Sequence, residues 1–103
     1  MNQFYPIIIL TNNKDLEVDN NYLLLNNNVF LTNNTTINYN NQEISFDYLI
    51  FDNTSLIINF DQTNILHDNK IPVTNFFYAT SVDNIFFTSN IIEAINNIEN
   101  EEF

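Results

Sequence analysis

The chain contains no glycine and no cysteine, and it has a single histidine, His67. Without cysteine there are no disulfides, no thiolate nucleophile and no cysteine metal sites. Without glycine, the chain cannot build a loop whose backbone amides closely approach a phosphate, nor the Gly-x-Ser-x-Gly turn of a hydrolase. His67 lies in a polar stretch that predicts a surface loop. We therefore expect a protein that is not an enzyme, with no catalytic residue, no cofactor and no metal.

Positive charge is almost absent as well, because two lysines and no arginine stand against 13 carboxylates, for a formal net charge of -11. The 23 Asn and 15 Ile are typical of an A/T-rich genome. Such a genome also favours lysine codons, so base composition does not explain the missing lysines. The simplest explanation is a partner whose own surface is basic. Two cations cannot offset repulsion by a polyanion, so we expect no direct nucleic-acid binding.

Apolar residues are abundant: they make up 45% of the 103 residues, and ten Phe and five Tyr argue against disorder. A chain of this length typically forms one domain, so we expect a single acidic domain over residues 1–103. No apolar run approaches the roughly 20 residues of a membrane span, and Tyr5–Leu10 lacks the basic flank of a signal peptide. These features predict a soluble, intracellular, cytoplasmic protein that binds no membrane.

Asparagine takes the place of glycine at turns, because its short polar side chain bonds locally and tolerates positive φ. Asparagines recur every seven residues at positions 20, 27, 34 and 41, and an apolar residue follows each after three positions. These apolar residues are Leu23, Phe30, Ile37 and Ile44. Each unit predicts a turn and a short strand, and together they predict an antiparallel meander. The alternative is low-complexity sequence that falls in phase by chance.

The clearest strand is Glu43–Phe51. Its even-numbered residues from Ile44 to Ile50 are expected on one face, and Leu49 and Phe51 on the other, which predicts a central strand covered on both sides at its end. The dipeptide Asn40-Asn41 before it fits a two-residue hairpin turn. Further strands are expected at Tyr5–Leu10, Leu56–Phe60, Phe76–Thr80 and Ile85–Thr88, with Pro6 and Pro72 at edges or strand starts.

Helical periodicity is confined to the C-terminal segment, where Asn90 and Glu93 resemble a capping box. Isoleucines at helical spacing define the face expected to pack on the sheet: Ile91, Ile92, Ile95 and Ile98. We therefore expect a mainly β protein of the α+β class, an antiparallel meander of short strands with one C-terminal amphipathic helix.

Two short segments, Asp47–Ile50 and Val73–Thr80, resemble strand segments of flavin-dependent disulfide reductases. The glycines with which those enzymes approach FAD are missing here, and so is their cysteine pair. The resemblance therefore implies no flavin site, and no residue role is carried over from it.

The best functional candidate is the segment Asp15–Asp19. If it is extended, its three carboxylates share one face at intervals of about 6.6 Å, while Leu16 and Val18 face the other way. Such a row can occupy a groove built for a phosphate backbone, where lysines and arginines are unpaired. The alternative is an ordinary solvated acidic surface. The residues expected to contact the partner are Asp15, Glu17, Asp19, Glu93, Glu99, Glu101, Glu102 and, as an aromatic anchor, Phe103.

Three classes of function compete. The first is a non-catalytic acidic binding protein that docks on a basic surface of a nucleic-acid-handling assembly and inhibits or silences it. It would be a ribosome-associated dormancy (hibernation) factor or a phage-type nucleic-acid mimic that inhibits a defence nuclease. The second is a structural subunit of a larger complex, whose acidity only serves solubility. The third is a small-molecule-binding β-domain or an unrecognised enzyme.

Overall fold

The computed structural model describes residues 3–54 and 56–103. The elements follow in the order β1 (Gln3–Leu10), β2 (Leu23–Leu25), β3 (Phe30–Asn33), β4 (Thr36–Tyr39), β5 (Gln42–Phe51), η1 (the 3₁₀ helix Phe60–Gln62), β6 (His67–Asp68), β7 (Ile71–Pro72), β8 (Ile85–Phe87) and α1 (Ile91–Glu99). Strands dominate, and α1 is the single α-helix of the described residues. The expected mainly β, α+β class with one C-terminal helix is confirmed.

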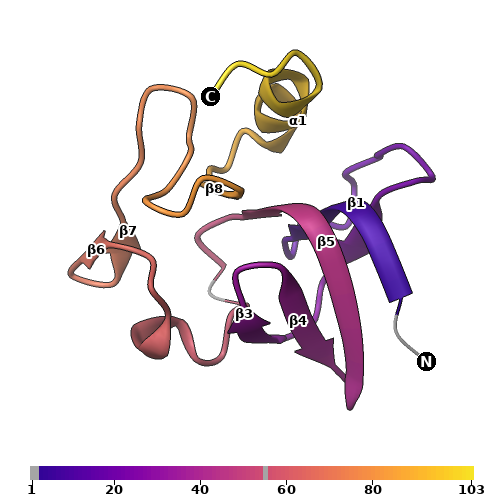
Figure 1. Cartoon of the computed structure of the whole chain (residues 1–103). Coiled ribbons are helices and arrows are strands. Elements are labelled where there is room, and N and C mark those ends of the chain that lie inside the picture. Colours follow the sequence, from indigo (N-terminus) through magenta and orange to yellow (C-terminus); the bar gives the residue numbers. More distant parts are fainter. Residues whose placement is uncertain (1–2, 55) are drawn as a thin grey trace.

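A six-stranded sheet organises the fold (Figure 1). Its strands run in the order β2-β1-β5-β4-β3, and β8 pairs with the second half of β5. The expected antiparallel meander is present where β3 pairs with β4 and β4 with β5. The pairs β1–β2, β1–β5 and β5–β8 are parallel. The sheet is therefore mixed, because the connections that precede β2 and β8 carry the chain back before the next strand begins.

Asparagines make the tight turns, as the sequence predicts. Asn40 and Asn41 join β4 to β5 with φ angles of 52° and 63°. Positive φ at both positions belongs to the type I′ turn, whose twist matches that of the paired strands. The turn between β6 and β7 is similar, with Asn69 at 51° and Lys70 at 67°. Lysine therefore occupies one turn position at which glycine or asparagine is usual.

Alternate residues of β5 do not all contact the same apolar cluster. Ile44 and Phe46 belong to one apolar cluster, whereas Tyr48 and Ile50 contact the other. The expectation that these four residues share a face is therefore wrong. The change of cluster occurs opposite Pro6 of β1, where the pairing of β1 with β5 is interrupted. Proline has no N–H to donate to the ladder, so the sheet can change its twist at this point.

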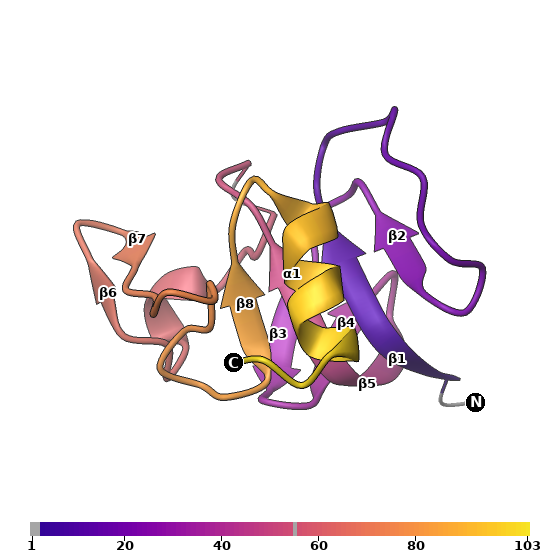
Figure 2. The ribbon, with the colours of Figure 1, turned by 90° about the horizontal axis from the view of Figure 1, so that it is seen from above.

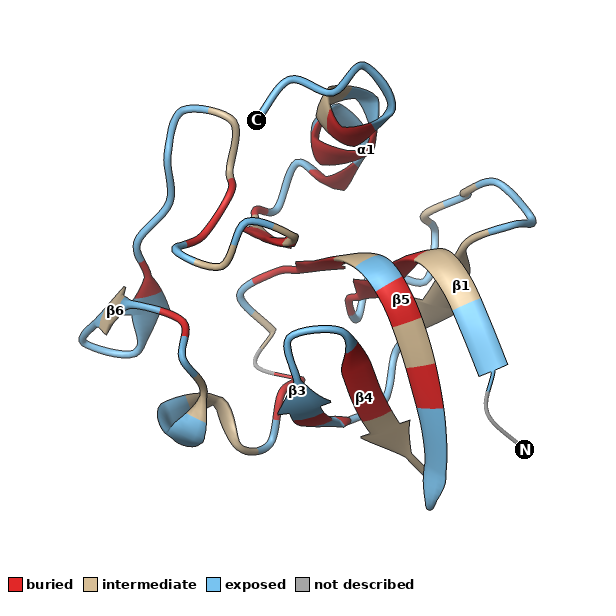
Figure 3. Ribbon diagram, viewed as in Figure 1, coloured by how far each residue is buried: buried red, intermediate tan, exposed pale blue. Residues whose placement is uncertain are grey.

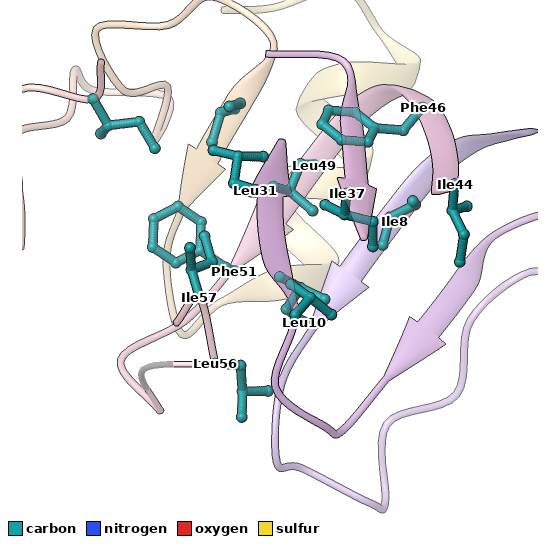
Figure 4. Packing of buried hydrophobic residues seen from close by; sticks show 13 residues of the cluster. Ile8, Leu10, Leu31, Ile37, Ile44, Phe46, Leu49, Phe51, Leu56 and Ile57 are labelled. Carbon is teal, nitrogen blue, oxygen red and sulfur yellow. The ribbon is translucent and has the colours of Figure 1, made fainter. Parts of the chain in front are cut away.

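Two apolar clusters cover the two faces of the sheet. The larger one lies between β1, β3, β4, β5 and the segment around Ile57 (Figure 4). The smaller one lies beneath α1. Leu49 and Phe51 belong to the larger cluster and Ile50 to the smaller, so the end of β5 is covered on both sides, as expected. Buried residues accordingly follow β5 and the face of α1 that is turned toward the sheet (Figure 3).

Helix α1 lies over β1, β5 and β8 (Figure 2). The residues it buries are Ile91, Ala94, Ile95 and Ile98. Ile92 is 47% exposed, so its expected place in the apolar face is wrong, because a period of 3.6 residues puts Ala94 there instead. Asn90 is the N-cap, but its side-chain amide donates to Glu93 Oε2 at 2.7 Å and caps no backbone N–H. The expected capping box is therefore replaced by a bond between the two side chains.

The strand expected at Leu56–Phe60 does not form. This segment makes one bridge to Val29 and then enters η1. Asn59 turns its side chain to β3 instead: its Oδ1 accepts from the Leu31 N–H at 2.9 Å, and its Nδ2 donates to the Leu31 carbonyl at 3.0 Å. One side-chain amide thus takes the place of a neighbouring strand at the edge of the sheet.

The strand expected at Phe76–Thr80 is also replaced by a loop, which makes one bridge from Ala79 to Phe86. The side-chain oxygen of Asn75 accepts hydrogen bonds from the N–H groups of Phe77 and Ala79, at 2.8 and 3.0 Å. These local bonds compete with strand pairing and hold the aromatic run in a turn. The β propensity of the aromatic residues does not overcome them.

Candidate functional site

The loop between β1 and β2 displays the first acidic row. Asp15, Glu17 and Asp19 are exposed, and the segment is not part of a named strand. Leu16 and Val18 alternate with them and pack against the apolar cluster beneath α1. The alternation expected from the sequence is therefore present. The loop is anchored by its apolar side and presents its carboxylates to solvent.

Tyr22 joins this loop to the last turn of α1. Its hydroxyl donates to Glu99 Oε2 at 3.1 Å. Burial raises the pKa of Tyr22, and so do the hydrogen bond to Glu99 and the negative charges of Glu99 and Asp19. Tyr22 therefore lies close to both Asp19 of the loop and Glu99 of the helix end.

Helix α1 ends in a Schellman motif that includes the last two glutamates of the sequence, Glu101 and Glu102. The Glu102 N–H donates to the Asn97 carbonyl at 2.7 Å, and the Glu101 N–H donates to the Ile98 carbonyl at 3.1 Å. Glu101 has a φ of 56°, the left-handed conformation that this motif requires. Both glutamates are exposed. We use the name acidic face for the exposed carboxylates of the loop and the helix end, of which Asp19 and Glu99 lie close together at Tyr22: Asp15, Glu17, Asp19, Glu99, Glu101 and Glu102.

Glu93, which was expected at the partner contact, lies apart from this face. It is about 120° around the helix axis from Glu99, given 3.6 residues per turn. Its Oε2 accepts hydrogen bonds from the Tyr78 hydroxyl at 3.0 Å and from the Asn90 amide at 2.7 Å. The bond to Glu93 raises the pKa of Tyr78. Glu93 therefore fixes the Tyr78 loop against α1.

Phe103, the expected aromatic anchor, packs on its own chain. Its ring meets those of Tyr48 and Phe86 edge-on, with centroid distances of 5.6 and 5.5 Å. It remains 42% exposed. The ring holds the tail against the sheet beside α1.

A cavity of about 570 Å³ opens where β5 and β8 end, between the sheet and the β6–β7 hairpin. Three aromatic rings line it, with Phe51 at 5.9 Å from Phe60 and 5.1 Å from Phe87 between centroids. Asp52, Asp61 and Lys70 are its charged residues. No motif in the sequence predicts this site. Its residues come from separate segments that only the tertiary fold brings together, and the acidic pattern alone gave no signal for it.

Asp52 is a structural part of this region. It is 8% exposed, and its Oδ2 accepts a hydrogen bond from the Thr11 hydroxyl. Its Oδ1 accepts two more from Thr54, from the N–H at 3.0 Å and from the hydroxyl at 2.6 Å. Thr11 and Asp52 follow β1 and β5, so the bond links the carboxyl ends of two adjacent parallel strands.

His67 belongs to β6, where its ring packs on Phe60 at 4.9 Å between centroids and its Nδ1 lies 2.8 Å from the Ile65 carbonyl oxygen. Within residues 3–54 and 56–103, no group of three or more His, Cys, Asp or Glu side chains is placed to hold a metal ion. None of the helices in this part of the chain is long and apolar enough to cross a membrane.

No protein-family model matches the chain, and neither a curated protein nor a solved structure matches it.

Proposed function

We propose that this protein is a non-catalytic binding protein that docks its acidic face on a basic surface of a nucleic-acid-handling assembly and inhibits or silences it. The observation that supports this function is the junction at Tyr22. Through it, Asp19 and Glu99 from two distant segments lie close to one side chain, in a chain with a net charge of -11.

The physical advantage of this arrangement is preorganisation. Leu16 and Val18 hold the acidic loop on the cluster beneath α1, so its carboxylates need little further ordering on binding. The long-range field of the whole molecule steers it toward a positive surface. Lysines and arginines that contact a phosphate backbone form such a surface when the nucleic acid is displaced.

Two settings suit this function. In the first, the protein sits on a ribosome or a similar particle and silences it during dormancy. In the second, a virus or mobile element uses it as a nucleic-acid mimic that occupies a defence nuclease. Both require the same contact, carboxylates against lysines and arginines, and they differ in the identity of the partner.

The test is sedimentation of the native protein from lysate of its source cells, at low and high salt, with and without nuclease. We expect co-migration with a nucleoprotein particle at low salt and release at high salt, because salt screens charge pairs at a solvated interface. Free migration as a small monomer in every condition would contradict the dormancy setting. The inhibitor setting is then tested by capture of nucleases on the immobilised protein.

Two matched variants locate the contact. Substituting the loop carboxylates (Asp15→Asn, Glu17→Gln, Asp19→Asn) is expected to abolish binding without unfolding the protein. The control removes three exposed carboxylates away from the acidic face and from Phe103 (Glu43→Gln, Asp61→Asn, Asp68→Asn) and is expected to retain binding. Equal losses in the two variants would show that net charge alone, rather than this face, drives the association.

A structural subunit of a larger complex is the second candidate, and exposed apolar side chains favour it. Leu66, Ile71 and Val73 of the hairpin region are 59%, 61% and 46% exposed, and Phe76 is 90% exposed. An interface made by these residues would be apolar and would persist at high salt, whereas docking through the acidic face would not.

A further inference from the structure

We propose that the cavity between the β6–β7 hairpin and the sheet binds a small organic cation with a flat apolar body, such as an arylamidine. Its volume of about 570 Å³ falls within the range of roughly 300–1,000 Å³ that is usual for small-molecule sites. It lies at the carboxyl ends of the parallel strands β5 and β8, where open sheets commonly bind ligands.

The aromatic lining favours a flat body. Phe51 is buried, whereas the rings of Phe60 and Phe87 beside it are half-buried and reach the cavity. On the rim, Ile58 and Ile71 are 66% and 61% exposed. An apolar ligand would remove this surface from water, which is the main gain of such binding. It would also support a two-stranded hairpin, which is marginally stable on its own.

The charges favour a cation. Asp52 and Asp61 outnumber Lys70 in the lining. Asp52 accepts three hydrogen bonds from Thr11 and Thr54, which hold its carboxyl group in place at the edge of the cavity. Asp61 lies exposed on η1 and is available to pair with a ligand. The faces of the phenylalanine rings attract a cation as well, and the net charge of -11 opposes any anion.

The experiment is an amide NMR titration of the full chain with benzamidine, an aromatic cation, and with benzamide, its neutral counterpart of the same shape. We expect saturable shifts at Phe51, Phe60, Ile71 and Phe87 with benzamidine, and affinity about tenfold lower with benzamide, because the charge and the cation–π attraction are lost. Equal affinities would overturn the proposal, and so would the absence of shifts at these residues with both probes.

Two charge-matched variants test the role of the cavity itself. Asp61→Asn is expected to weaken benzamidine binding about two- to fivefold, in keeping with the strength of exposed charge pairs. Asp68→Asn removes the same charge from an exposed residue of β6 outside the lining, and is expected to leave the affinity unchanged. Equal weakening in the two variants would show that the general field of the protein, rather than this site, attracts the cation.

A third probe distinguishes a free ligand from the side chain of a partner protein. Nα-acetyl-arginine amide carries the cation without an aromatic body, and is expected to bind about tenfold more weakly than benzamidine. Tighter binding by the arginine derivative would overturn the proposed ligand class in favour of a protein side chain. No residue of the acidic face lines the cavity, so either outcome leaves the docking function to its own test.

Discussion

Because the chain has no glycine, other residues adopt the positive φ angles that its turns require, and some of these residues are strained. Asn40, Asn41 and Asn69 adopt this conformation at little cost, because their side chains bond locally. Tyr78 and Glu101 adopt it as well, at 72° and 56°, and neither has that advantage. For an ordinary side chain the left-handed conformation costs about 1–2 kcal/mol. The hydrogen bond from Tyr78 to Glu93 holds the first of these residues in place, and the local backbone bonds of the Schellman motif hold the second.

Replacing Glu101 by glycine is expected to stabilise the protein by about 0.5–1 kcal/mol, since glycine is the preferred residue at this position of the motif. The measurement is the free energy of unfolding in urea. The control, Glu102→Gly, removes the same charge at the next position, which does not need positive φ, and is expected to give no gain. A gain of equal size in both variants would attribute the effect to charge.

The two tyrosines bonded to glutamates are expected to ionise above their usual pKa of 10.0. Glu99→Gln is expected to lower the pKa of Tyr22 and leave Tyr78 unchanged, and Glu93→Gln to do the reverse, so each variant is the control for the other. Because the folded-state pKa is raised, the stabilisation is fully present below pH 10 and is lost as the pH rises through the folded-state value. Tyrosine ¹³C NMR against pH measures this, and a shift of both tyrosines in either variant would contradict the separation of the two bonds.

At the scale of elements, side-chain amides replace backbone partners at the edges of the fold. Asn59 bonds both the N–H and the carbonyl of Leu31 at the free edge of β3, and Asn75 closes the loop that carries Phe76. An edge strand with unpaired backbone groups invites pairing with another chain. The Asn59 side chain therefore fixes the start of η1 on the sheet. It also makes the edge of β3 less available for pairing with another chain.

Asn59→Ala is expected to destabilise the protein by about 1–3 kcal/mol, because two partly buried hydrogen bonds are lost at about 0.5–1.5 kcal/mol each. The measurement is again urea unfolding, compared with Asn64→Ala at an exposed position, for which we expect a change within about 0.5 kcal/mol. Asn59→Asp keeps the acceptor but sets a carboxylate oxygen against the Leu31 carbonyl oxygen, so it is expected to cost at least as much as Asn59→Ala. An Asn59→Ala protein as stable as the Asn64→Ala protein would refute the strand-replacement role.

At the scale of the whole molecule, a charge of -11 within a radius of gyration of 12.5 Å means mutual repulsion among the carboxylates. Repulsion of this kind destabilises the compact state while it keeps the protein soluble. The carboxylates that we propose for docking therefore act against the stability of the fold that presents them.

Raising the salt concentration from about 10 mM to about 500 mM at pH 7 is expected to raise the Tm by about 4–8 °C, equivalent to about 1 kcal/mol, because salt screens this repulsion. The same change near pH 4.1, the isoelectric point of the sequence, is expected to have much less effect, since the net charge is then close to zero. Differential scanning calorimetry measures both. Equal shifts at the two pH values would point to a general salt effect on hydrophobic burial instead.

The local pattern of the chain determined its strands, turns and helix where side-chain periodicity and turn chemistry agree. Asn40-Asn41 with the strands on either side, the isoleucines at positions 91, 95 and 98, and the alternation of acidic and apolar residues in Asp15–Asp19 all follow from short-range rules. These rules fail at Phe76–Thr80, where one asparagine side chain redirects a β-prone segment.

The amino-acid sequence by itself determined the acidity, the absence of glycine- and cysteine-dependent chemistry, and the α+β class. The tertiary structure alone decided which carboxylates belong together. Tyr22 unites Asp19 with Glu99, while the helical turn and the bond from Tyr78 place Glu93 on another side. The tertiary structure also created the cavity beside Asp61, which no local sequence pattern predicts. The physical reason is that parallel strand pairing joins segments far apart in the chain, and such contacts depend on the packing of the whole core.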